Sequence, residues 1–223
     1  NNQKLLNNSK YDQKKNIILI DRSRYLQAIE SSVVSVALAN SLNYNLYVFT
    51  DRLKENIIKI YEKFGIKKFY YIFSYSFFLN KIKLFFLTFL NLIILIIKLN
   101  LKSQKFEWLI NKSKINGYEI GDLIYDTYVR SNNSFLKPKI DLKFLKILFS
   151  SIFRLLKIEK LIEKIQPKLI ICCTEAYAHN EGITIRIALK KNIKVLRVHS
   201  QPDSISLEKC SKKKILYGDK NLI

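Results

Sequence analysis

Several residue types that mark common classes of protein are scarce in this sequence of 223 residues, which holds only three cysteines, two histidines and no methionine. Cys172 and Cys173 adjoin each other in an apolar run, where we expect them to be small core residues of a strand, and Cys210 stands apart. No two cysteines have the CxxC spacing of zinc and redox motifs. The sequence therefore disfavours a disulfide framework and a metal site, and it indicates a reducing, cytoplasmic compartment.

Glycine is also rare, with five residues, and the glycine-rich phosphate-binding motifs are missing. There is no GxGxxG, no P-loop and no GxSxG, and the zinc-protease signature HExxH is absent too. These absences exclude the commonest dehydrogenases, nucleoside triphosphatases, hydrolases and zinc proteases. We expect no bound cofactor.

Acidic residues number 18 against 39 lysines and arginines, which gives a formal net charge of +21. This excess favours anionic partners, among them sugar nucleotides, bilayer headgroups and nucleic acid. Residues 141–165 are predicted to form a long helix with a basic, solvated surface made of Lys143, Lys146, Arg154, Lys157, Lys160 and Lys164. No recognisable nucleic-acid module accompanies these charges, so we expect no specific nucleic-acid partner.

Short apolar runs alternate with segments of helical periodicity along the chain. The segments at residues 23–41, 53–64 and 180–190 have helical spacing, and the first of them carries Leu26, Ile29, Val33, Val36 and Ala37. The runs predicted as strands are Ile17–Ile20, Leu46–Phe49, Phe69–Ile72, Leu169–Cys172 and Lys194–Val198. This alternation predicts the α/β class, with a Rossmann-like parallel sheet covered by helices.

The domain organisation follows from the same pattern. Residues 1–15 form a polar lead, and residues 16–206 form one Rossmann-like domain with a helical insertion at about 77–165. Residues 207–223 are expected to begin a linker or a following region. Because the sequence starts with Asn1 and stops at Ile223 without a helix cap or polar tail, we expect it to be part of a longer protein.

The most apolar segment runs from Phe77 to Lys102 and allows several interpretations. Its core of fourteen residues holds only Thr88 and Asn91 as polar residues, and it spans roughly 21 Å as a helix, against roughly 30 Å for a bilayer core. The polar positions Asn80, Lys81, Thr88, Asn91, Lys98 and Lys102 fall on one narrow stripe. We expect a buried or domain-covering helix, or a helix in the membrane interface, and not a membrane span.

Candidate site residues follow the predicted strands, because ligands of open α/β sheets bind beyond the carboxyl ends of the strands. Residues 174–182 and 199–206 are predicted to be loops at such strand ends. Glu175 and His179 of the first loop are the candidates for general base. The candidates for substrate binding are Arg22, Arg24, Thr174, Gly182 and His199. Helix capping for the acidic loop and simple solvation for the arginines remain the alternative interpretations.

The segment from Gly117 to Arg130, which reads GYEIGDLIYDTYVR, is similar to a motif of bacterial surface-carbohydrate biosynthesis proteins that look like GT-B glycosyltransferases. Val129 replaces the usual leucine. The likeness continues around Gly182, Ile183 and Arg186 and covers most of residues 16–200. In the usual strand-end loop of that family a Ser/Thr–His pair is expected, whereas here Thr174 is followed by Glu175.

The resemblance implies the N-terminal, acceptor-side half of a GT-B architecture. Its implied activity is transfer of a sugar from a nucleotide-activated donor to a glycan acceptor in capsule or lipopolysaccharide synthesis, at the inner face of the cytoplasmic membrane. This part alone is expected to be inactive. Asp122, Asp126 and Arg130 of the motif recur on one helix face and are candidates for substrate contact or for a structural ladder.

A second hypothesis is a non-catalytic basic module that binds an anionic membrane surface or nucleic acid. Salt separates the two, because a mainly electrostatic binder loses affinity steeply as salt rises, whereas a sugar-nucleotide site keeps saturable binding.

Overall fold

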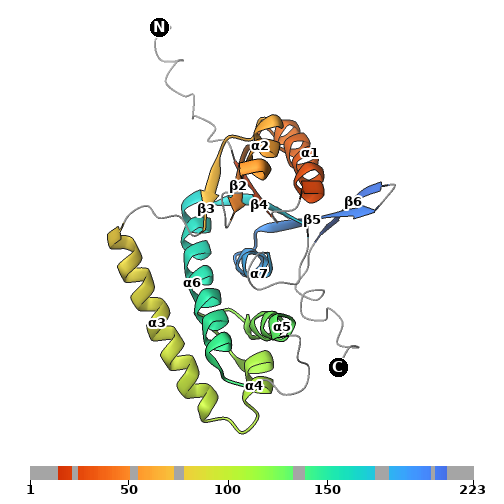
Figure 1. Ribbon diagram of the computed structural model, residues 1–223. Coiled ribbons are helices and arrows are strands. Elements are labelled where there is room, and N and C mark those ends of the chain that lie inside the picture. Colours follow the sequence, from red (N-terminus) through yellow and green to blue (C-terminus); the bar gives the residue numbers. More distant parts are fainter. Residues whose placement is uncertain are drawn as a thin grey trace.

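The computed structural model describes residues 15–21, 25–50, 55–72, 78–132, 139–173, 181–201 and 204–209. In these ranges a six-stranded sheet carries helices on both faces (Figure 1). The strands are β1 (Asn16–Ile20), β2 (Asn45–Thr50), β3 (Phe69–Tyr71), β4 (Pro167–Cys172), β5 (Lys194–Gln201) and β6 (Ser204–Lys209). The helices are α1 (Tyr25–Leu42), α2 (Glu55–Lys63), α3 (Phe78–Asn100), α4 (Lys105–Lys112), α5 (Gly121–Asn132), α6 (Leu142–Ile165) and α7 (Gly182–Lys190).

The strand order is β3-β2-β1-β4-β5-β6. The first five strands of this order pair in parallel, which confirms the predicted Rossmann-like α/β fold. The chain moves from β1 outward through β2 to β3 and then crosses to β4 on the other side of β1. The gap between the carboxyl ends of β1 and β4 is therefore the switch point at which α/β sheets bind ligands.

The far edge of the sheet differs from the prediction. Residues 199–206 were expected to form a loop, whereas β5 continues to Gln201 and pairs antiparallel with β6, from Leu196 opposite Lys209 to Gln201 opposite Ser204. The expectation was wrong because the apolar run ends at Val198 and the strand does not. The polar residues that follow Val198 extend beyond the paired part of β4 and continue the strand through their pairing with β6.

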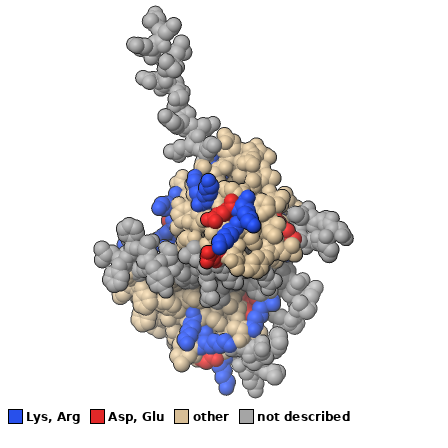
Figure 2. All heavy atoms as spheres, turned by 45° about the horizontal axis from the view of Figure 1, so that its top comes forward, with Lys and Arg blue, Asp and Glu red and all other residues tan. Residues whose placement is uncertain are grey.

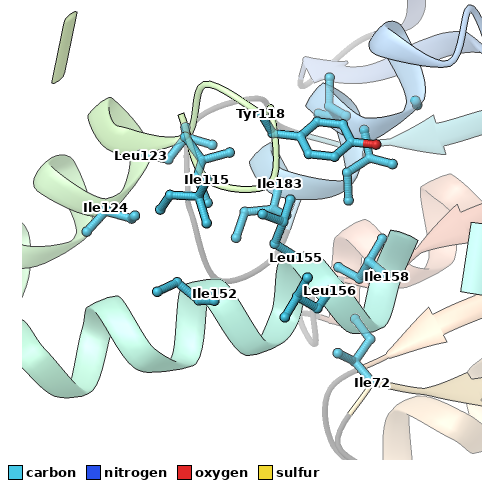
Figure 3. Close-up of a cluster of buried hydrophobic side chains, with 14 of the residues drawn as sticks. Ile72, Ile115, Tyr118, Leu123, Ile124, Ile152, Leu155, Leu156, Ile158 and Ile183 are labelled. Atoms are coloured by element: carbon cyan, nitrogen blue, oxygen red, sulfur yellow. The ribbon is translucent and has the colours of Figure 1, made fainter. Parts of the chain in front are cut away.

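Alternating residues of β1 supply the two faces of the sheet. Ile17 and Leu19 belong to a buried cluster with residues of α1 and α2, and Ile18 and Ile20 belong to a larger cluster with residues of α3 to α7. Figure 3 shows part of the larger cluster, in which Leu155 and Ile158 of α6 meet side chains of α7 and of the segment before α5. Helices thus cover both faces, as a parallel sheet requires.

Helix α1 packs with its small side chains inward. Its buried positions are Ala28, Ser31, Ser32, Ser35 and Ala39, whereas Leu26, Ile29 and Val33 are exposed. The apolar spacing indicated a helix correctly, yet the large apolar residues lie on its outer side. Burial of serine is compatible with this packing because Ser31 and Ser32 donate to backbone carbonyls one turn earlier, each at 2.5 Å.

The predicted helical insertion corresponds to α3, α4, α5 and α6. Helix α6 begins where the Asp141 side chain accepts a hydrogen bond of 2.7 Å from the backbone N–H of Phe144. Lys143, Lys146, Lys160 and Lys164 are exposed on α6 as expected. Arg154 is not part of this basic surface, since it is only 2% exposed. Its helical position beside Ile147 and Ile158 places it on the buried side.

Helix α3 lies alongside α6 at the margin of the molecule (Figure 1). Leu84, Thr88, Leu92, Leu95 and Leu99 form its buried side, so the polar stripe predicted from the sequence does not mark the solvent side at Thr88. The Thr88 and Asn91 side chains donate instead to carbonyls of their own helix, at 2.7 and 2.8 Å. The opposite side, called here the α3 apolar face, exposes Ile82, Phe85, Phe86, Phe89, Leu90, Ile93, Ile94 and Ile97.

Candidate functional site

The sheet brings the ends of β1 and β4 together. Leu19 lies opposite Ile171 in the parallel register, so the residues that follow each strand leave the sheet at the same edge. The predicted site residues Arg22, Arg24, Thr174, Glu175 and His179 belong to the segments 22–24 and 174–180, which lie outside the described residues. Their assignment stays a prediction, but the strands that carry them meet at the switch point.

His199 lies within β5, and its Cα pairs with Ser206 of β6. Arg197 is level with Cys172 at the end of β4, so His199 lies two residues beyond that end. It is therefore at the predicted edge of the sheet, although it belongs to a strand and not to a loop.

A buried hydrogen-bonded group surrounds Asp21, the first residue after β1. The Asp21 carboxylate accepts hydrogen bonds from Thr50 Oγ1 at 2.8 Å and from Tyr61 Oη at 2.7 Å. All three side chains are buried, and the Asp21 backbone N–H donates to the Phe49 carbonyl at 2.8 Å. These bonds connect β1, β2 and α2 directly beside the switch point and fix the backbone from which residues 22–24 depart.

The phenol of Tyr61 responds to this environment. Burial raises its pKa well above its ordinary value, and the neighbouring Asp21 carboxylate adds to the shift through its charge and its hydrogen bond. Tyr61 therefore remains a neutral hydrogen-bond donor, which is the form that Asp21 requires. Asp21, Thr50 and Tyr61 were not among the predicted site residues. The four-residue spacing of Ile57 and Tyr61, both on the buried side of α2, was the available signal.

We expect Tyr61→Phe to lower the free energy of unfolding at neutral pH by about 1–3 kcal/mol, because the buried Asp21 carboxylate loses a donor. The wild-type contribution is present below the ordinary tyrosine pKa of about 10 and is lost as the pH rises toward the higher folded pKa. The variant should therefore lose less stability than the wild type at alkaline pH. Urea unfolding over a pH series measures both effects. Tyr25→Phe, at an exposed tyrosine, is the matched control, and equal alkaline slopes for Tyr61→Phe and wild type would contradict the expectation.

A second buried carboxylate lies at the end of β4. Glu181 is 1% exposed and accepts a hydrogen bond of 3.2 Å from the backbone N–H of Cys173. It immediately precedes α7, whose first residue is the buried Gly182, and its side chain makes no capping hydrogen bond to that helix. Glu181 thus joins the end of β4 to the beginning of α7. The predicted site residues included Gly182 and omitted Glu181.

The carboxylates of Asp21 and Glu181 give the switch point two fixed acceptors of hydrogen bonds. Here they accept hydrogen bonds from two hydroxyls and one backbone N–H and thereby hold the two strand ends in place. Among the described residues no group of three or more histidine, cysteine, aspartate or glutamate side chains could hold a metal ion.

The motif residues of α5 make contacts between helices. Asp122 pairs with Arg186 of α7, whose guanidinium also donates to the Glu119 carbonyl. Asp126 pairs instead with Arg130 on the exposed surface of α5, at 2.9 Å. The expected four-residue ladder is therefore present between Asp126 and Arg130, whereas Asp122 turns toward another helix.

Lys190, one turn after Arg186 on α7, completes this junction. Its ammonium donates to the Gly117 carbonyl at 2.8 Å and lies 4.1 Å from the centre of the Tyr118 ring. The chain before α5 is thus held against α7 by two cations four residues apart. This pairing of α7 with the motif was not predicted from the sequence, although both segments carry the same resemblance.

The described geometry consists of a sheet with five parallel strands and one antiparallel strand, a switch point with two buried carboxylates, and the segment 117–122 in contact with α7. No family model, no curated protein and no solved structure matches this chain.

Proposed function

We propose that this chain is the N-terminal, Rossmann-like half of a GT-B-type glycosyltransferase that acts in bacterial capsule or lipopolysaccharide synthesis. It would transfer a sugar from a nucleotide-activated donor to a glycan acceptor. The observation that best supports the proposal is the switch point between β1 and β4, because ligands of such sheets bind at this crevice. The resemblance of residues 117–130 to a surface-carbohydrate motif supplies the reaction class.

In this proposal the chemistry belongs to the residues that follow the two strands. Arg22 and Arg24 after β1 would contact an anionic group of the substrate, and His199 would lie beside them from β5. Glu175 or His179 after β4 would take the proton from the acceptor hydroxyl as it attacks the donor sugar. Asp21 and Glu181 would fix the strand ends from which these residues depart, through their bonds to Tyr61 and Cys173.

The proposal is tested with the complete gene product and bacterial membranes that supply lipid-linked acceptors. We expect one labelled nucleotide-sugar of a panel to transfer its sugar into the lipid or polymer fraction, with saturation by the donor. Moderate salt should leave that transfer in place, since the site recognises its ligand by more than charge. A folded protein that transfers no sugar from any donor, or whose binding of every donor disappears with salt, would overturn the proposal.

A further inference from the structure

The α3 apolar face is too large and too continuous for a surface that stays in water. Its eight side chains are all at least 39% exposed, and at 100° per residue they cover about half of the helix circumference. They include three phenylalanines, and Phe86 alone is 66% exposed. Continuous apolar patches of this kind mark sites of contact with a membrane or another protein.

We infer that α3 lies flat in the interface of an anionic membrane, with its apolar face among the acyl chains. The helix is long and apolar enough to cross a bilayer by length and composition, over Ile82–Asn100. Its packing argues for the flat orientation, because Leu84, Leu92 and Leu99 anchor it to the domain along its whole length.

The neighbouring helix α6 makes it unfavourable for α3 to cross the bilayer. Phe149 of α6 contacts the Phe85 ring at 5.3 Å between centroids. By helical periodicity Lys146 and Lys160 fall within about 60° of Phe149 on α6, and both are exposed. If α3 crossed the bilayer in its present position, these ammonium groups would enter the hydrocarbon, which is strongly unfavourable. In the flat orientation they lie at the level of the headgroups.

Charge identifies the partner as an anionic lipid surface. Lys83 is exposed at the beginning of α3, and Lys98 and Lys102 are exposed at its end. On the face shown in Figure 2, basic side chains exceed acidic ones. A second copy of the chain would bring another +21 charge toward this surface and be repelled. Anionic phosphatidylglycerol headgroups instead attract lysines, and each lysine near the membrane surface raises the binding affinity by about fivefold. Trp108, half-buried beneath Lys102, adds the aromatic residue typical of a membrane interface.

The first test measures binding of the whole chain to vesicles by flotation. We expect binding to vesicles of phosphatidylcholine with phosphatidylglycerol, and much weaker binding to phosphatidylcholine alone. The triple variant Phe86→Gln/Leu90→Gln/Ile97→Gln alters the middle of the α3 apolar face and should reduce binding by about a hundredfold. These residues are exposed, so circular dichroism and thermal unfolding should match the wild type.

The matched control places the same three glutamines on α1. Leu26→Gln/Ile29→Gln/Val33→Gln also replaces exposed large apolar side chains, on the other face of the sheet. It should leave vesicle binding unchanged. Equal loss in both triple variants, absence of binding by the wild type, or a wild-type dimer that the α3 triple variant dissociates would each overturn the inference.

The second test distinguishes lying from crossing. Tryptophan is placed singly at Phe86 or Ile97 in a Trp108→Phe background, and its depth in vesicles is read from quenching by brominated lipids. The two positions lie on one side of α3, about 16 Å apart along the axis. A flat helix gives the same depth at both positions, and a crossing helix gives different depths, which would refute the flat orientation. Neither test involves a sugar donor, so the outcome is independent of the proposed function.

Discussion

Gly121→Ala is expected to destabilise the domain by about 3 kcal/mol or more, which is a large share of the stability of a typical domain. A Cβ atom at this position would lie 1.8 Å from the Leu109 carbonyl oxygen and 2.5 Å from Ser113 Oγ. The first of these is backbone of the neighbouring helix α4, which cannot yield by a rotation of a side chain. The α4–α5 contact must therefore open, or the helices must shift within the buried cluster around Leu109 and Ile124. Urea unfolding followed by circular dichroism measures the loss.

Gly65→Ala is the control for this prediction. Gly65 has a φ of +78°, and no atom lies within 4 Å of the place that the alanine methyl group would take, so an alanine there meets only the cost of a left-handed backbone. That cost is about 1–2 kcal/mol. If Gly121→Ala were no more destabilising than Gly65→Ala, the close approach of α4 and α5 would be wrong.

This prediction also separates the two roles considered for the segment 117–130. Gly121 serves the contact with α4, Asp122 pairs with Arg186, and the Tyr128 hydroxyl donates to the Lys139 carbonyl at 2.9 Å. These contacts give three motif residues a structural explanation. Asp126 and Arg130 remain on the surface, paired with each other, and their part in substrate contact stays a prediction.

The five parallel strands could be predicted because each is a short apolar run between turn residues, a pattern that depends on local sequence alone. Strand β6 could not, since four of the six residues of SISLEK are polar and the segment becomes a strand through its pairing with β5. The inward side of α1 was equally hidden. Ser31 and Ser32 satisfy their hydroxyls within the helix, so polar residues fill a buried interface next to the sheet.

From the sequence, the site could be located only at the carboxyl ends of the parallel strands. Residues after β1 and β4 were identified by the rule for parallel sheets, and the register of β1 and β4 brings the carboxyl ends of the two strands level with each other. The bond from Tyr61 to Asp21 joins residues 40 positions apart, and the pair of Arg186 and Asp122 joins residues 64 apart. Sequence periodicity carries no information about such contacts.

Glu175→Gln is expected to slow sugar transfer by the complete gene product by about a hundredfold or more, because general-base catalysis contributes at least that factor. The residue comes three positions after the end of β4 in the sequence, and a glutamine of nearly equal size accepts no proton. The measurement is the rate of transfer from the labelled donor at saturating donor and acceptor, with circular dichroism to show that the variant folds.

Two control variants are measured in the same transfer assay. Glu107→Gln makes the same chemical change at an exposed position of α4, far along the chain from the strand ends, and should leave turnover unchanged. Lys157→Ala removes a basic group of α6 and should alter only membrane or salt behaviour. If Glu175→Gln were fully active while Lys157→Ala abolished turnover, the reaction would take place on the α6 side of the domain, and the crevice between β1 and β4 would not be the active site.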